Sequence, residues 1–276
     1  MRNTAKITTV LAAGALTFGL TACGSGDSDS GSDDASGPLV VAASPVPHAE
    51  ILNFVRDNLA EDAGLELEVK EFTDYVTPNT ATEDGSVDAN YFQNQPYLDD
   101  FNKKNGTHIV PVVTVHLEPL GLYSNKVDKA DDLKSGATIA VPNDTVNEAR
   151  ALKLLADNGL ITLKDGVGSE ATPADIAENP KNLKFKELEA AQTPRSLDDV
   201  DAAVVNGNYA IESDLKPAED ALVLESADNS PYGNFLAVKE GNEDDPRVTK
   251  LKELLTSDEV RKFIEDEYDG SVIASF

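Results

Sequence analysis

From residue 39 onward, short apolar runs alternate with segments in which apolar residues recur at helical spacing. The run 39–43 (LVVAA) predicts a buried strand, and 65–72 alternates apolar with charged residues, as a half-buried strand does. A helix is predicted between them, beginning near Pro47 and ending at Gly64. Its apolar face consists of Ile51, Leu52, Val55 and Leu59.

The same alternation continues to the C-terminus. Thr77 and Pro78 offer an N-cap and a first-turn proline for a second helix, and 145–158 predicts a third, with Gly159 as its stop. Two more amphipathic helices are expected near the C-terminus, before a short strand-like end. Strands alternating with helices favour an α/β fold with largely parallel sheets. Further strands are expected at 109–115, 120–124, 138–141, 183–188, 202–205, 222–224 and 235–238.

The first 38 residues follow other patterns. A short basic start precedes an apolar run, 7–20, that is typical of a secretory signal peptide and too short for a membrane span. The run leads into LTAC, which resembles the bacterial lipobox and implies cleavage before Cys23 and acylation of its thiol. We therefore expect a signal peptide at 1–22 and a lipidated, disordered tether at 23–38, where Gly, Ser, Asp and Pro predominate.

Charge and cysteine content narrow the function classes. The chain carries 23 Lys and Arg against 50 Asp and Glu, a net charge of −27, so its surface repels nucleic-acid phosphates. Nucleic-acid partners are therefore disfavoured. Cys23 is the only cysteine, which excludes an internal disulfide and a cysteine-based metal site.

Motifs of an enzyme are scarce. The three histidines, His48, His108 and His116, fall in no HExxH pattern, and neither a GxSxG elbow nor a phosphate-binding GxxxxGK[ST] loop occurs. The segment 166–171 (GVGSEA) imitates a dinucleotide fingerprint, but it follows a charged turn and not a clear strand, so a loop is the better interpretation. The sequence indicates no cofactor and no metal site, and it favours a binding module over an enzyme.

A small zwitterionic ligand needs a cation for its carboxylate, oxygens for its ammonium and an apolar pocket for its side chain. Arg150 lies one turn inside the helix predicted after TIAVP, where it could meet an anion held by free amides at the helix start. The alternative is a surface arginine paired with a neighbouring acid. Tyr91, Phe92 and Tyr97 lie close together and could line a pocket, although aromatic residues more often belong to a core.

Several motifs together resemble the methionine-binding lipoproteins of the NlpA type, in the family's order and over nearly all of the chain after the tether. Among them are SPVPHAEIL (44–52), DANYFQNQPYLD (88–99), HLEPLGLYS (116–124), VPNDTVNEAR (141–150) and SPYGNFLAVK (230–239). The resemblance implies a two-lobe, periplasmic-binding-protein-like α/β fold of type II, with the ligand in the cleft between the lobes. It implies one lobe from 39–118 and 231–276 and a second from 119–230.

The resemblance also implies roles for individual residues. Arg150 would clamp the ligand carboxylate, with Asn147 as a weaker candidate beside it. Many members have a histidine where this chain has Asn94, which implies an altered affinity or specificity. The polar end of the ligand would be held by Asn206 and Asn234, and the thioether chain would be surrounded by Tyr75, Phe92 and Tyr97.

The function that follows is capture of L- or D-methionine, or a related amino acid, for the permease and ATPase of an ABC importer. The lipid anchor implies a location on the extracytoplasmic face of the cell membrane. Three alternatives stay open: the same architecture binding another amino acid or a small peptide, a surface-anchored enzyme, and an adhesin or signalling lipoprotein.

Overall fold

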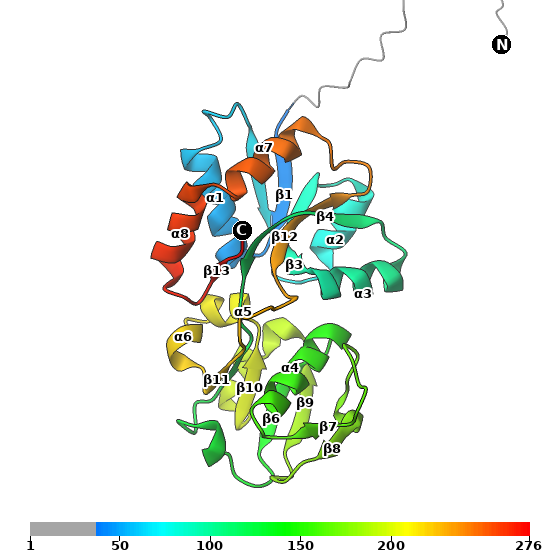
Figure 1. The fold of residues 1–276 in the computed structure, drawn as a ribbon, viewed down its shortest axis with the longest axis vertical. Helices are drawn as coiled ribbons and strands as arrows, with labels where there is room; N and C mark the ends of the chain where they lie inside the picture. The colour runs from blue at the N-terminus through cyan, green and yellow to red at the C-terminus, as the bar shows by residue number, and fades with distance from the viewer. Residues whose placement is uncertain (1–36) are drawn as a thin grey trace, which may run out of the picture. The chain divides into compact units, whose positions relative to one another are not determined.

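A computed structural model describes residues 37–276 of the chain (Figure 1). The predicted signal peptide, Cys23 and nearly all of the predicted tether lie outside these residues. Within the described part, no helix combines the length and the apolar character needed to cross a membrane.

The first lobe is built on a six-stranded sheet with the strand order β13-β4-β12-β3-β1-β2. β1 runs parallel to β2 and β3, whereas β12 runs antiparallel to β3 and β4, and β13 antiparallel to β4. The strands are β1 (Leu39–Ala43), β2 (Leu67–Glu71), β3 (Ala89–Asn94), β4 (Ile109–Leu117), β12 (Asn234–Lys239) and β13 (Ile273–Ala274).

Helices cover both faces of this sheet (Figure 1). Val41 of β1 packs into the core shared with α1, α7 and α8, whereas the next residue, Ala42, packs with Ala81 of α2. Successive side chains of β1 point to opposite faces of the sheet, and both faces are buried. All positions of β1 are therefore apolar. The helical elements are η1 (Pro45–Ala49), α1 (Glu50–Asn58), α2 (Thr77–Asp84), α3 (Gln95–Asn105), α7 (Pro246–Leu255) and α8 (Asp258–Tyr268).

The second lobe contains a five-stranded sheet with the order β11-β5-β10-β6-β9. Its strands are β5 (Gly121–Tyr123), β6 (Thr138–Pro142), β9 (Lys184–Leu188), β10 (Ala202–Val205) and β11 (Val223–Leu224). Its helices are α4 (Thr145–Asp157), α5 (Gly207–Glu212) and α6 (Pro217–Asp220). A small hairpin, β7 (Thr162–Leu163) with β8 (Ile176–Glu178), and short turns of 3₁₀ helix complete it: η2 (Ala130–Asp132), η3 (Pro173–Asp175), η4 (Ala190–Gln192) and η5 (Pro194–Asp198).

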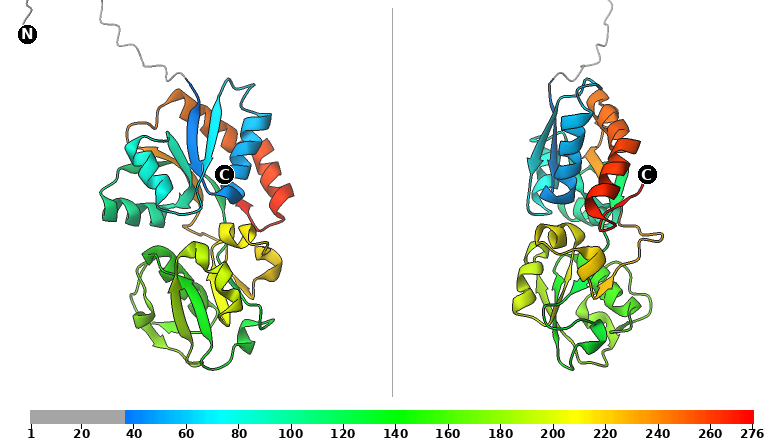
Figure 2. Two further views of the ribbon diagram at one scale, coloured as in Figure 1. Left: turned by 180° about the vertical axis from the view of Figure 1, so that it is seen from behind. Right: turned by 90° about the vertical axis from the view of Figure 1, so that its left-hand side faces the viewer.

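The chain passes between the two sheets twice, through 118–120 and again through 225–233 (Figure 2). The two-lobe α/β fold is therefore confirmed. The expectation of largely parallel sheets is wrong, because β12 brings the chain back beside β4 in the opposite direction, and β5 pairs antiparallel with β10 and β11.

The start of α2 also differs from the prediction. Thr77 is not the N-cap but the first helical residue. The reason is local: the Asp74 carboxylate accepts hydrogen bonds from the backbone N–H groups of Val76, at 2.8 Å, and Thr77, at 2.7 Å. An aspartate two to three residues earlier thus does what a capping threonine would have done.

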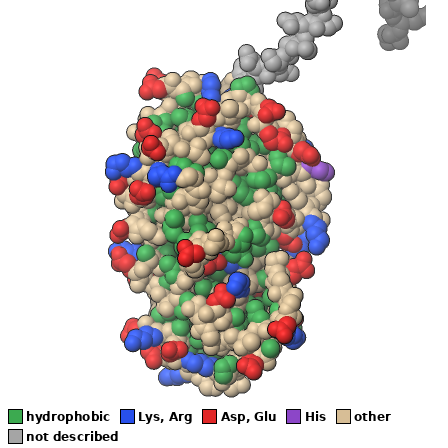
Figure 3. All heavy atoms as spheres, viewed as in Figure 1, with side chains coloured by type: hydrophobic (Ala, Val, Ile, Leu, Met, Phe, Trp, Pro, Cys, Tyr) green, Lys and Arg blue, Asp and Glu red, His purple; other side chains and the backbone are tan. Residues whose placement is uncertain are grey.

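Acidic side chains are spread over the face of the molecule in Figure 3, with lysines and arginines among them. No single strongly acidic patch stands out in this view. The face seen in this view offers no large basic surface for the phosphates of a nucleic acid.

Candidate functional site

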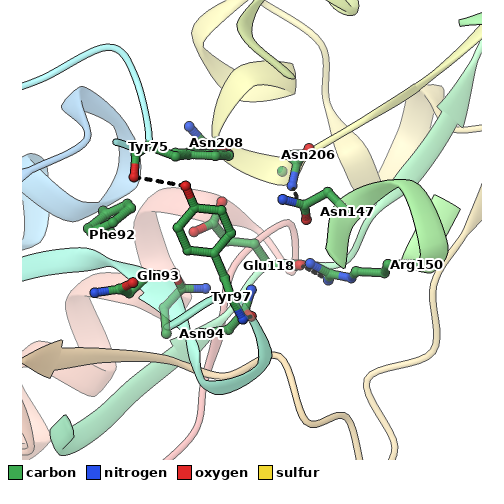
Figure 4. A pocket seen from close by; sticks show the side chains of 12 residues that line it. Tyr75, Phe92, Gln93, Asn94, Tyr97, Glu118, Asn147, Arg150, Asn206 and Asn208 are labelled. Atoms are coloured by element: carbon green, nitrogen blue, oxygen red, sulfur yellow. Dashed lines mark hydrogen bonds between the residues drawn. The ribbon is translucent and has the colours of Figure 1, made fainter. Parts of the chain in front are cut away.

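A pocket of about 360 Å³, including the part open to solvent at its mouth, lies between the two lobes (Figure 4). The residues that line it are Tyr75, Phe92, Gln93, Asn94, Tyr97, Glu118, Asn147, Arg150, Asn206, Gly207, Asn208 and Asn234.

The eight residues to which the family resemblance assigned roles line this one pocket, although they are spread from position 75 to position 234. Tyr91, which was grouped with Phe92 and Tyr97 as an aromatic residue that could line a pocket, does not line it and is fully buried. Four lining residues were not predicted: Gln93, Glu118, Gly207 and Asn208. Gln93 and Glu118 lie inside motifs that carried the family resemblance, and Gly207 and Asn208 directly follow Asn206, a residue that was predicted. Glu118 could have been found as the acidic residue at the end of β4, where the chain leaves the first lobe.

Three aromatic rings from the first lobe form one wall of the pocket. The Tyr75 ring centroid lies 6.0 Å from that of Phe92 and 5.8 Å from that of Tyr97. Both hydroxyls bond to protein atoms: Tyr75 donates to Asn208 Oδ1 at 2.5 Å, and Tyr97 donates to the Tyr75 carbonyl at 2.9 Å. The rings therefore offer the pocket an apolar surface, and the first of these bonds also joins the lobes.

Arg150 in α4 is 5% exposed and is held by several groups. Its Nε and Nη2 donate to the two carboxylate oxygens of Glu225, at 2.9 and 2.5 Å, and Nη2 also donates to the carbonyl of Glu118 at 3.0 Å. The guanidinium carbon lies 4.0 Å from the ring centre of Tyr232. The arginine is thus paired with an acid, as in the alternative interpretation, but it is buried at the pocket and its partner is 75 residues away.

The first turn of α4 differs from expectation as well. The backbone N–H of Asn147 donates to the Asp144 side chain at 2.9 Å, so this cap occupies an amide that was expected to hold a ligand anion. The Asn147 amide nitrogen also bonds Asp144, and its oxygen accepts from Asn206 Nδ2 at 3.0 Å. Asn147 therefore fixes the orientation of Asn206.

Two buried polar atoms of the lining have no partner within the described residues: Asn206 Oδ1, an acceptor, and Asn208 Nδ2, a donor. Buried polar groups are normally paired, so a lining that leaves one acceptor and one donor is suited to a ligand carrying both kinds of group. Asn94 differs, because its Oδ1 accepts from the backbone N–H of Tyr97 at 3.1 Å and caps α3.

Glu118 supplies a carboxylate to the pocket and is 6% exposed. Its Oε1 lies 2.8 Å from His116 Nε2 and 3.2 Å from His48 Nε2. Burial raises the pKa of Glu118, whereas His48, Arg150 and a hydrogen bond from the backbone N–H of Asn208 act in the opposite direction. The site thus combines a buried acid and a buried arginine.

Among residues 37–276, His48, His116 and Glu118 form a group that could hold a metal ion, since one donor atom from each lies within 4.8 Å of the others. Their separations are those of hydrogen bonds, however. An Nε2–H of His116 that donates to the carboxylate leaves no lone pair there for a metal. The hydrogen bonds account for the cluster as it stands.

Comparison with known proteins identifies the family of this chain. The family model of the NlpA lipoproteins matches residues 39–276. The chain belongs to the NlpA lipoprotein family. One relative is the methionine-binding lipoprotein MetQ of Bacillus subtilis. It is 42% identical to this chain over 258 residues, which are 92% of this chain and 93% of that protein.

Solved structures related to this NlpA family chain match it in fold and sequence. A nutrient-binding protein from Burkholderia cenocepacia, solved bound to methionine, superposes with a TM-score of 0.84 at 48% identity, covering 86% of this chain and 100% of that one. A periplasmic substrate-binding protein of an ABC transporter from Coxiella burnetii gives 0.82 at 43% identity, with 86% and 100% covered.

Proposed function

We propose that this NlpA family chain binds methionine between its lobes and delivers it to the permease and ATPase of an ABC importer. One observation carries the proposal: a buried arginine, a buried carboxylate and an aromatic wall meet in one small pocket. The methionine-bound relative and the relative from an ABC transporter support the same ligand and pathway.

The carboxylate of the ligand is assigned to Arg150 and to Asn208 Nδ2, the unpartnered donor. No hydrogen bond within the described residues uses Arg150 Nη1, which leaves that nitrogen for an anion, while Glu225 keeps the guanidinium in place. The ammonium is assigned to Glu118 and to Asn206 Oδ1, the unpartnered acceptor. Each charged end of a zwitterion thereby meets one charge and one amide.

The thioether chain is assigned to the wall formed by Tyr75, Phe92 and Tyr97, since sulfur packs favourably against aromatic rings. Asn234 lines the polar end, where its Oδ1 lies 3.1 Å from His48 Nε2. Asn147 acts through Asn206. Asn94 borders the pocket, and its amide nitrogen makes no hydrogen bond within residues 37–276, which leaves it to donate to a ligand.

We also propose the lobe limits stated above, 39–118 with 231–276 and 119–230, and anchoring of the chain through acylated Cys23 on the extracytoplasmic face of the membrane. The membership of the chain in a lipoprotein family supports this location. Closure of the lobes over the ligand would bury its charges, and the permease would then recognise the closed form.

Mass spectrometry of ligand released from the purified protein tests the proposal directly, and methionine is the expected ligand.

In calorimetric titration, Arg150→Ala is expected to weaken methionine binding by about 2–5 kcal/mol, as loss of one partner of a buried charge pair does. Arg195, an exposed arginine of the same lobe, provides the control, and Arg195→Ala should bind like the wild type. Equal affinities for the two variants would contradict the assignment. Turnover of a substrate would instead favour the surface enzyme.

A further inference from the structure

Behind Glu118, away from the pocket lining, lies a row of side chains that the ligand assignment does not use. Tyr91 of β3 and His116 of β4 are fully buried, and His48 of η1 is 1% exposed. The ring of His48 packs edge-on against both others, with centroids 4.8 Å away in each case. Three titratable groups buried together at the back of a binding site need an explanation.

The direction of the hydrogen bonds follows from the acceptors. Tyr91 keeps its proton, because burial raises the pKa of its hydroxyl well above the usual value. That hydroxyl bonds His116 Nδ1, and a phenol can donate or accept in such a bond, so the other ring nitrogen decides the tautomer. Burial lowers the pKa of His116 to about 3, so the ring is neutral and carries one proton. Nε2 lies 2.8 Å from the acceptor Glu118 Oε1 and holds that proton, and Nδ1 therefore accepts from the Tyr91 hydroxyl.

The imidazole of His48 also contacts Glu118 Oε1. Its Nε2 lies 3.2 Å from Glu118 Oε1 and 3.1 Å from Asn234 Oδ1, and both of these atoms are acceptors. Nε2 must therefore carry the proton. Burial lowers the pKa of His48 to about 4, against the raising effect of Glu118, and this ring too is neutral. Two N–H donors thus converge on one carboxylate oxygen.

The remaining surroundings of Glu118 restrict it further. A Cβ added to Gly207 would lie 2.7 Å from the Cβ of Glu118, so the backbone of α5 is packed directly against this side chain. The backbone N–H of Asn208 adds a further hydrogen bond. With Oε1 held by the imidazoles, the second oxygen is the one left for a cation in the pocket.

We propose that Tyr91, His116 and His48 are positioning residues that hold Glu118 as an oriented carboxylate for the ammonium of the ligand. The row thereby makes the site select for an α-amino group. This inference rests on the proposed function, because it assumes that Glu118 meets the ammonium.

The test compares methionine with its deaminated analogue, 4-(methylthio)butanoate, by calorimetry on the full chain in detergent. Tyr91→Phe removes one hydroxyl and frees His116 to change tautomer, so methionine affinity should fall about tenfold, the worth of one buried hydrogen bond to a charged pair. Affinity for the analogue, which has no ammonium, should change less than about twofold. Equal losses for both ligands, or no loss for methionine, would overturn the proposal.

Two further variants separate positioning from packing. His116→Gln can still donate an N–H toward Glu118 and should retain more of the preference for methionine over its analogue than His116→Leu does. Tyr268→Phe removes a buried hydroxyl of the same lobe that donates to Glu50 at 2.7 Å, and it should leave the preference unchanged. If the leucine and glutamine variants show the same preference, the hydrogen bond is not what positions Glu118.

A readout without ligand keeps this inference apart from the proposed function. In ¹⁵N spectra of the histidine-labelled wild type near neutral pH, His116 should be the neutral tautomer with its proton on Nε2, and Tyr91→Phe should disturb it. A doubly protonated ring, or a proton on Nδ1, overturns the inference whatever the protein binds. A wild type with the expected tautomer but no affinity for methionine would refute the proposed function and, with it, the ammonium role.

Discussion

Glu148 of α4 is a buried acid outside the pocket, and its replacement by glutamine should stabilise the protein. The side chain is 7% exposed, and its Oε1 has no hydrogen-bond partner within the described residues. Burial, followed by the nearby charges of Glu187 and Asp144, raises the pKa of Glu148 to about 7. Above that pH the folded protein must carry an ionised carboxylate in a site that disfavours it. Glu148→Gln removes the charge and keeps the size.

The size of the effect follows from the pKa. The pKa of Glu148 rises from 4.5 to about 7 on folding. At about 1.4 kcal/mol for each tenfold change in proton affinity, ionisation of this carboxyl lowers the free energy of unfolding by about 3 kcal/mol. The folded state holds this proton more tightly than the unfolded state, so wild-type stability falls as pH rises from 4.5 through about 7 and then levels off. The gain in stability from Glu148→Gln should therefore be absent at low pH and complete above about pH 7.

Urea unfolding of the ligand-free proteins at two pH values measures the difference in stability between Glu148→Gln and the wild type. At about pH 8 the variant should be more stable by about 3 kcal/mol, and at about pH 5 by less than about 1 kcal/mol. Glu178→Gln, at an exposed glutamate of the same lobe, should show no such gain. An equal gain at both pH values would refute the reasoning, because it would arise from packing or helix propensity and not from ionisation.

Two further variants probe the pocket and the contact between the lobes. Gly207→Ala would place a Cβ 2.7 Å from Glu118, so calorimetry should find methionine binding at least about tenfold weaker, whereas Gly168→Ala, with open space around its Cβ position, should bind normally. Tyr209→Phe loses the 3.0 Å hydrogen bond from the second lobe to the carbonyl of Thr73 in the first. It should weaken binding by about 1 kcal/mol while small-angle scattering shows a more open ligand-free form; an unchanged affinity and scattering profile would mean that this bond does not favour closure.

Local patterns were enough for most elements and for the fold class. The strands at 39–43 and 202–205 have the predicted limits, and the helix predicted at 145–158 is α4, Thr145–Asp157. Each is defined by neighbours within a few residues: apolar runs, helical spacing, a terminal glycine. The residues of the pocket lining were predicted in a different way. Arg150 and the amides were located through motifs shared with a family, since nothing local distinguishes a pocket asparagine from a surface one.

β3 shows where local patterns fail. Every residue of Ala89–Asn94 is buried, so no alternation of exposed and buried positions marks it as a strand. Its polar residues Asn90 and Gln93 are satisfied by each other and by Asn79, which joins them from α2. Such a network is decided by the packing of the helix on the sheet, and the sequence around each amide does not predict it.

The chemistry of the site depended on tertiary structure in the same way. The sequence by itself determined that a cation, several amides and a group of aromatic rings were present, and that the chain was α/β. Only the fold decided that Glu225 pairs with Arg150 across 75 positions and that His48 reaches Asn234 across 186. Orientation, burial and protonation arise from contacts between segments that meet only after two passages of the chain between the lobes, and no local pattern encodes such contacts.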